Sequence, residues 1–419
     1  MGGPLSGRET GCESRLTHYQ RRKTSVFARE YEKTDRLSPA AGRLLQAVWF
    51  DAGDQAAGRL LLSILHLAVD GVSWRILVPD LAACWASVAA GRLPELSPRG
   101  TSYRGWGHRL VEEAQAAGRV AELSQWLGML SGRSVRLFDG ELDGGRDIAG
   151  TARHLTVELP AGLTGALLTQ VAAAFHGGIN DVLLSSLVVA VADWGRRRGR
   201  PGGPAVLVDL EGHGREEIFA DVDLSRTVGW FTSLYPVRLD PGALDIAEAM
   251  AGGAALGRAV KSIKEQLRGL KDNGLGYGLL RYLNAPTAAR LSGYGAAQLG
   301  FNYLGRFAAG EGQDWGIAAE AGALGGGGDA GMPLGHGVEV NALTLDGADG
   351  ARLCASWTWA PALLDEAAVG DLARGWFAVL EALVGHAALP AAGGRTPSDL
   401  PLVDLSQAEI ERLERMYAD

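Results

Sequence analysis

Segments with the two-residue period of a strand alternate with segments that have the 3.6-residue period of a helix over most of this chain. The strand-like segments, alternating or apolar on both faces, are residues 44–50, 58–71, 153–160, 205–210, 227–239, 298–305, 338–346 and 351–360. The helix-like segments are residues 76–88, 107–130, 180–194, 245–269 and 369–383. This alternation predicts an α/β or α+β protein with mixed sheets and two lobes.

The local patterns make three specific predictions. Segments 44–50 and 58–71 form a hairpin whose second strand, apolar on both faces, is central in its sheet. A helix follows, with one apolar face made of Ile76, Leu77, Leu81, Cys84, Trp85 and Val88. The last helix faces the core with Val369, Leu372, Trp376, Val379 and Leu383.

Composition excludes several classes of protein. The net charge of −8 provides no basic field to hold a nucleic acid. The longest apolar runs are shorter than the roughly 18 residues that a membrane span needs, so we expect no membrane span. Three cysteines, far apart and odd in number, match neither metal-ligand spacing nor a disulfide framework. Without a signal-peptide pattern at its start, the chain is predicted to be cytoplasmic.

The same patterns suggest a domain organisation. Residues 1–35 have no sustained period and are predicted to be a poorly ordered start. A loop rich in Gly and Asp at 139–150 is our candidate boundary, which divides the chain into lobes 36–150 and 151–396. Residues 397–419 follow as a separate segment.

Polar clusters interrupt three apolar strands, and buried positions are seldom given to charged or polar groups for stability alone. The clusters are His66 with Asp70 and Gly71, then Glu211, His213, Arg215 and Glu216, then Asn302 and Tyr303. His66 has the residue type of a base that works near neutral pH, but a core histidine bonded to backbone has the same pattern. The second cluster can contain groups that shift one another's pKa, or it can be a solvated loop. The third also fits an ordinary half-buried strand.

Familiar catalytic motifs are otherwise missing. The glycine-rich segments 273–278 and 322–331 match neither GxGxxG nor the GxxxxGK[ST] phosphate loop. The sequence also contains no GxSxG elbow and no HExxH or CxxC pair. We therefore predict no nucleotide site, no hydrolase triad of that type and no metal site.

Five segments together resemble one family. They are HLAVDGVSWRIL (66–77), EGHGRE (211–216), RTVGWFTSLYPV (226–237), NGLGYG (273–278) and FNYLGRF (301–307). In this order they are similar to the epimerization domains of nonribosomal peptide synthetases, which belong to the condensation-domain superfamily. The resemblance covers residues 36–419. EGHGRE and FNYLG favour epimerization over peptide-bond formation, and residues 397–419 look like the linker to the condensation domain of a following module.

The resemblance implies a chloramphenicol-acetyltransferase-like pair of lobes around a central tunnel. The phosphopantetheine arm of a peptidyl carrier protein would enter it, and its aminoacyl or peptidyl thioester would lose the Cα proton and regain it on the other face. By the same resemblance His66 and Glu211 are the catalytic acid/base pair, contributed by different lobes. Asp70 would orient its loop by pairing with an arginine, Gly71 would support it, and Asn302 and Tyr303 would line the site. The domain itself would bind neither metal nor organic cofactor.

Two departures from the family pattern keep other functions open. The first histidine of the family's HHxxxDG motif is Leu65 here, and the segment before His66 is shorter than in the family. A strand and a helix of the first lobe are therefore expected to be missing, which would expose apolar core surface. The alternatives are a condensation-type acyltransferase that forms amide bonds without needing Glu211, and a catalytically inactive remnant of a synthetase module.

Overall fold

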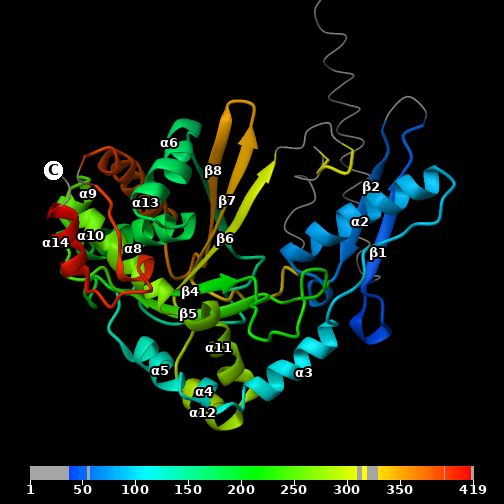
Figure 1. Ribbon diagram of the computed structural model, residues 1–419, viewed down its shortest axis with the longest axis horizontal. Coiled ribbons are helices and arrows are strands. Elements are labelled where there is room, and N and C mark those ends of the chain that lie inside the picture. Colours follow the sequence, from blue (N-terminus) through cyan, green and yellow to red (C-terminus); the bar gives the residue numbers. More distant parts are fainter. Residues whose placement is uncertain (1–36, 54–56, 309–313, 319–328, 391, 417–419) are drawn as a thin grey trace, which may run out of the picture. The chain divides into compact units, whose positions relative to one another are not determined.

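A computed structural model of the chain describes residues 37–53, 57–308, 314–318, 329–390 and 392–416. It divides into two compact units (Figure 1). Unit 1 comprises Met1–Pro98, Arg226–Trp230 and Gly310–Gly328, and unit 2 comprises Arg99–Ser225, Phe231–Ala309 and Asp329–Asp419. The predicted poorly ordered start, residues 1–35, lies outside the described residues.

Unit 1 contains the predicted hairpin. Strands β1 (Leu45–Phe50) and β2 (Arg59–Ile64) pair in antiparallel register from Leu45 opposite Ile64 to Phe50 opposite Arg59. Among the described residues this sheet has two strands, so the prediction that the second strand is central is wrong for this part of the chain. The short helices η2 (Pro39–Ala41) and η3 (His66–Ala68) and the helix α2 (Gly71–Ala89) complete the unit.

Helix α2 has the predicted apolar face, but much of that face is exposed. Ile76 is buried, but Leu81, Trp85 and Val88 are 37%, 62% and 60% exposed. A stripe of this spacing indicates only that one face of the helix is apolar; whether a partner covers it depends on tertiary structure. Trp49 on β1 is also 59% exposed. The described part of unit 1 thus exposes apolar side chains on β1 and α2.

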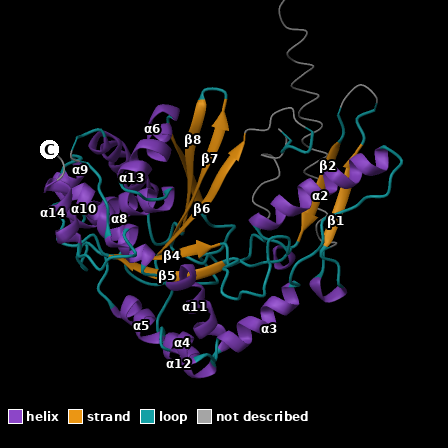
Figure 2. Ribbon diagram, in the orientation of Figure 1, coloured by secondary structure: helices purple, strands orange, loops and turns teal. Residues whose placement is uncertain are grey.

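Unit 2 contains a six-stranded mixed sheet, as the alternation predicted (Figure 2). The strand order is β3-β8-β7-β6-β4-β5. β6 runs parallel to β4 and β7, and the other neighbours are antiparallel. The strands are β3 (Arg153–Leu159), β4 (Val206–Gly212), β5 (Ser233–Leu239), β6 (Leu299–Ala308), β7 (Val338–Gly347) and β8 (Gly350–Trp359).

Three long helices pack on one face of this sheet and form the main core (Figure 1). They are α8 (Ile179–Arg197), α10 (Ala254–Arg268) and α13 (Glu366–Ala387). α8 is buried all round from residue 181 to 195, which agrees with its continuous apolar sequence. The stripe predicted for the last helix is confirmed: all five of its residues are buried, and Trp376 makes edge-to-face contacts with Phe301 and Trp357 of the sheet.

Shorter helices complete unit 2. The α-helices are α3 (Tyr103–Glu113), α4 (Ala117–Val120), α5 (Leu123–Ser131), α6 (Ala161–Ala166), α7 (Ala172–Ala174), α9 (Ile246–Met250), α11 (Leu275–Gly278), α12 (Ala285–Leu291) and α14 (Gln407–Met416). The 3₁₀ and π turns are η4 (Leu167–Val171), η5 (Lys271–Gly274), η6 (Leu279–Leu283) and η8 (Pro397–Asp399).

Three predicted elements are shorter than expected. The segment predicted as one helix over 107–130 forms three helices, α3 to α5. Where α3 ends, the side-chain amide of Asn284 donates a hydrogen bond of 2.8 Å to the carbonyl of Ala114. The helix predicted over 245–269 breaks between α9 and α10, where Gly252 has a φ of +76°. The strand predicted over 227–239 begins only at Ser233, because Arg226–Trp230 belongs to unit 1.

The compact units also differ from the predicted lobes. The first continuous segment of unit 1 ends at Pro98, whereas the predicted lobe ends at residue 150. Trp106 and Trp126, both buried, lie in unit 2. Residues 397–416 pack on the same unit: the buried Lys264 ammonium lies 2.6 Å from the Asp399 carboxylate, and Ile410 is buried. That the segment leads to a further module stays a prediction.

Within the described residues, no single helix is long and apolar enough to cross a membrane. Helices 161–174 and 179–197, bent by 99° at their junction, reach the length and composition of a span only when counted together.

Candidate functional site

Polar side chains line the face of the unit 2 sheet opposite the helices. Alternate residues of each strand point to opposite faces, so Asp209 and Glu211 of β4 share this polar face while Val208 and Leu210 enter the core. The strand register places polar residues of the neighbouring strands in one row with Glu211. Its members on the neighbouring strands are Asn302, Asn341, Ser356 and Thr156.

Glu211 and Asn302, both predicted site residues, are in direct contact. The Asn302 side-chain amide donates a hydrogen bond of 2.7 Å to Oε2 of Glu211. Because neighbouring strands hold both residues, the position of the carboxylate at the end of β4 is well defined. Glu211 is exposed, so a reactant in solvent can reach the carboxylate. A rigidly held, accessible carboxylate of this kind is suited to general acid or base chemistry.

A charged cluster that the sequence did not predict lies beside this pair. His336 is buried, and its Nε2 lies 3.0 Å from the Asp209 carboxylate; Asn341 donates a hydrogen bond of 2.8 Å to Glu339. Burial lowers the pKa of His336, but the hydrogen bond to Asp209 and the Glu339 carboxylate, 3.9 Å from Nδ1, outweigh burial and raise the pKa to about 9. The nearby His336 ring in turn lowers the pKa of Glu339. The one signal in the sequence was Asp209, a charge inside an apolar strand.

Gly300 makes room for this cluster. It faces Asp209 on one side and Glu339 on the other, and a Cβ at this position would overlap the imidazole ring of His336. The histidine therefore lies directly against the backbone of β6. Among the described residues, no group of three or more His, Cys, Asp or Glu side chains is arranged to hold a metal ion.

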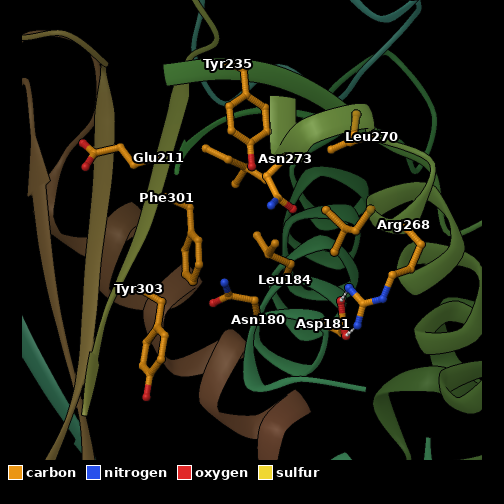
Figure 3. Close-up of a pocket in the computed structure, with 12 residues that line it drawn as sticks. Asn180, Asp181, Leu184, Glu211, Tyr235, Arg268, Leu270, Asn273, Phe301 and Tyr303 are labelled. Atoms are coloured by element: carbon orange, nitrogen blue, oxygen red, sulfur yellow. Dashed lines mark hydrogen bonds and ion pairs between the residues drawn. The ribbon is translucent and has the colours of Figure 1, made fainter. Parts of the chain in front are cut away.

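A pocket of about 100 Å³ opens on the core side of the same strands (Figure 3). In Figure 3 the side chains of Leu184, Phe301 and Asn273 point toward the pocket, whereas the Glu211 carboxylate is turned away from it. Tyr303, the third predicted residue of this unit, lines the pocket, and its hydroxyl lies 2.8 Å from Oγ1 of Thr344. The other lining residues are Asn180, Asp181, Leu210, Tyr235, Leu267, Arg268 and Leu270.

One ion pair and one buried tyrosine are among the residues that line the pocket. Arg268 lies 2.8 Å from Asp181, which also accepts a hydrogen bond of 2.7 Å from the amide of Gly178 at the start of α8. Burial, with a smaller contribution from Glu216, raises the pKa of Tyr235 to about 12. Tyr235 lies in the quoted segment 226–237, but sequence reasoning did not single it out.

The EGHGRE segment is a packed turn rather than the solvated loop that the sequence left open. Gly214 has a φ of +67°, and a Cβ there would overlap the carbonyl oxygen of Phe231. Only glycine fits such a position. The Arg215 guanidinium lies 4.0 Å from the centre of the Phe231 ring. Glu216 accepts a hydrogen bond of 2.8 Å from Asn273.

The remaining predicted residues lie in unit 1. His66 follows β2 as the first residue of η3, and its ring lies 4.7 Å from that of Trp230 with an interplanar angle of 57°. It is exposed, so the alternative of a core histidine is wrong. Leu65, which stands at the family's first histidine, donates its amide proton to the carbonyl of Leu44 at 2.9 Å.

Asp70 begins helix α2. Its Oδ1 accepts hydrogen bonds of 2.8 Å from both the amide and the hydroxyl of Ser73, which makes Asp70 the N-cap. The Ser73 hydroxyl also donates to the carbonyl of Gly229 at 3.0 Å. This cap fixes the loop between His66 and α2, the orienting role expected of Asp70; its pairing with an arginine stays a prediction. Gly71 is exposed, and a Cβ there would meet no atom within 4 Å.

The predicted site residues thus form two groups. His66, Asp70 and Gly71 belong to unit 1, whereas Glu211, Asn302 and Tyr303 belong to unit 2. His66 and Glu211 belong to different units, but their role as an acid/base pair stays a prediction. That His66 and Glu211 face each other across a tunnel stays a prediction.

Comparison with known proteins shows which family this chain resembles. The condensation-domain family matches residues 13–399. Linear gramicidin synthase subunits D and C of Brevibacillus parabrevis are 34% and 36% identical to this chain over 94% and 90% of its length. The matches cover 7% and 5% of those two proteins, so the chain corresponds to a small part of each.

Solved structures of related domains are also similar to this chain. The epimerization domain from the third module of tyrocidine synthetase B is 27% identical with a TM-score of 0.67, covering 83% of this chain and 72% of that one. The first condensation domain of the CDA synthetase shares the fold at 18% identity and a TM-score of 0.51, covering 83% and 68%. The chain therefore belongs to the condensation-domain family of nonribosomal peptide synthetases.

Proposed function

We propose that this domain epimerizes the Cα of an aminoacyl or peptidyl thioester carried on the phosphopantetheine of a peptidyl carrier protein. The observation that carries the proposal is the exposed Glu211 carboxylate, which Asn302 holds at the end of β4. Both residues belong to the motifs that resemble epimerization domains, and the similar solved structure from tyrocidine synthetase B is such a domain. The proposal includes no cofactor bound by this chain, a cytoplasmic setting and a downstream condensation domain as a further partner.

The proposed chemistry consists of two proton transfers. A base on one face of the substrate takes the Cα proton, and the electron pair passes to the thioester carbonyl as an enolate. A protonated group on the opposite face then returns a proton to Cα, which inverts the centre. Glu211 and His66 are the proposed pair, because each is exposed and each is held by its unit. Asn302 occupies Oε2 of Glu211 and thereby orients the carboxylate.

Isotope exchange at Cα tests this proposal. The purified chain is incubated in D2O with an L-aminoacyl carrier protein, and deuterium at Cα is followed by mass spectrometry. We expect exchange in the wild type and its loss in Glu211→Gln, which keeps the size of the side chain and removes its basicity. Glu217→Gln is the matched control, because Glu217 is an exposed glutamate six residues away and lines no site described above. Unchanged exchange in Glu211→Gln would refute the role of Glu211.

A condensation-type acyltransferase is the second candidate, supported by the family assignment and by the exposed His66. It predicts an amide product when donor and acceptor carrier proteins are both supplied. It also predicts that Glu211→Gln forms this amide without loss of activity. The exposed apolar surface of unit 1 supports a third candidate, an inactive remnant. A chain that is folded by circular dichroism but yields neither exchange nor amide would support the remnant.

A further inference from the structure

The backbone beside the pocket turns through three consecutive left-handed residues. Asp272, Asn273 and Gly274 have φ values of +48°, +46° and +78°, directly after Lys271 at the start of η5. Glycine adopts this conformation freely, whereas a non-glycine residue is strained in it and is found there where the surroundings enforce it. Asp and Asn are the side chains that tolerate it best. Two of them in succession indicate that another part of the structure holds the segment in place.

Arg119 is the group that holds it. Its side chain is 1% exposed and lies in the short helix α4, far from the segment in sequence. One guanidinium nitrogen lies 2.7 Å from the Asp272 carboxylate and 3.0 Å from Glu113, and another lies 2.9 Å from Glu122. A buried arginine with three carboxylate partners is a rigid support, because charge-assisted hydrogen bonds hold it from several directions. Removing the arginine would leave these carboxylates without the counter-charge they share.

Close packing fixes the rest of the segment around the same residues. A Cβ at Gly274 would overlap the ring of Tyr235, and a Cβ at Gly276 would overlap the carboxylate of Glu122. The glycines of the NGLGYG segment therefore let the backbone lie against the pocket phenol on one side and the Arg119 cluster on the other. They serve close packing, not phosphate binding.

Asn273 connects this support to the candidate site. Its side chain lines the pocket, and its amide donates a hydrogen bond of 2.8 Å to Glu216 of the EGHGRE segment (Figure 3). The amide group has a second N–H and a carbonyl oxygen, which are the groups needed to bind a carbonyl or amide of the substrate. Its direction depends on the left-handed turn, and the turn depends on Asp272 and Arg119.

We propose that the pocket receives part of the substrate, and that Arg119 is a positioning residue, which acts through Asp272 to hold the Asn273 amide toward that part of the substrate. This inference rests on the proposed epimerization for its kinetic readout. Since small misplacements of a group that orients the substrate can lower rates by up to about 100-fold, the ion-pair cluster would control turnover without touching the substrate.

A double-mutant cycle in the full chain tests the proposal. Asn273→Gly removes the amide and still allows the left-handed backbone; Arg119→Lys keeps the charge but cannot span three carboxylates. We expect each variant to lower kcat for Cα exchange by about tenfold or more, and the double variant to be no slower than Asn273→Gly alone. Arg258→Lys is the matched control with wild-type kcat, because the Arg258 side chain is 58% exposed and pairs with Glu248 at 3.4 Å, outside the Arg119 cluster.

Amide hydrogen exchange supplies a readout that does not depend on activity. Peptides covering residues 270–278 should exchange faster in Arg119→Lys than in the wild type, while peptides from α8 and α13 keep their protection. If Arg119→Lys does not fold, Asp272→Gly replaces it in the cycle, since glycine keeps the backbone and removes the anchor. Additive effects on kcat, or unchanged exchange at 270–278, would overturn the positioning role. If the wild-type chain shows no exchange at Cα, the proposed function is overturned instead. Amide hydrogen exchange at 270–278 would then still test whether Arg119 holds this segment.

Discussion

Replacing His336 by glutamine removes the buried positive charge that lies between Asp209 and Glu339. The folded protein holds the proton of His336 more tightly than the unfolded chain, because the pKa rises from 6.5 to about 9. This stabilisation is fully present below pH 6.5 and is lost as the pH rises through about 9. At about 1.4 kcal/mol for each pH unit between these values, the free energy of unfolding should fall by about 3 kcal/mol across this window.

Urea unfolding at a series of pH values from 6 to about 9.5 measures this dependence. The fluorescence of the buried tryptophans Trp357 and Trp376 reports on the unfolding of unit 2, to which His336 also belongs. In the wild type the free energy of unfolding should decrease across the window. His336→Gln should be less stable by about 3–5 kcal/mol at pH 6.5, because two carboxylates then lack their counter-charge, and its stability should vary little with pH. An equal decrease in the variant and the wild type would refute this account.

His154→Gln is the matched control. His154 lies on the same face of the sheet, but it is exposed and bonded to Thr358 at 3.0 Å rather than to a carboxylate. We expect its unfolding curves to follow those of the wild type at every pH. A change as large as that of His336→Gln would mean that the pH dependence does not come from the buried cluster.

Three further predictions concern the site and the core. Asn302→Ala should lower Cα exchange at least tenfold without changing the unfolding midpoint, because it removes the bond that orients Glu211; wild-type exchange would contradict this. Lys264→Met should destabilise unit 2 by about 3–5 kcal/mol in urea unfolding, because it leaves the Asp399 carboxylate without its buried partner; a change below 1 kcal/mol would contradict this. Trp376→Ala should cost about 3–5 kcal/mol in the same assay through the cavity it leaves, and a soluble variant with unchanged stability would show that the core repacks.

The residues that sequence reasoning placed correctly are those whose position depends on local pattern. The period of α13 predicted its five buried residues, and the alternation in β4 put Asp209 and Glu211 on one face. Motif resemblance selected Glu211 and Asn302, and the register of β4 and β6 then brought them into contact.

The sequence by itself determined the class of fold, the type and place of strongly periodic elements such as α8 and α13, and the motif residues, because backbone geometry repeats every two or 3.6 residues whatever the rest of the chain does. Tertiary structure alone decided where charges find partners. Arg119 meets Asp272, and His336 meets Asp209, across more than 120 residues of chain. It also decided that α2 exposes Trp85. A buried charge is stable only beside its partner, and no local pattern records a partner that distant.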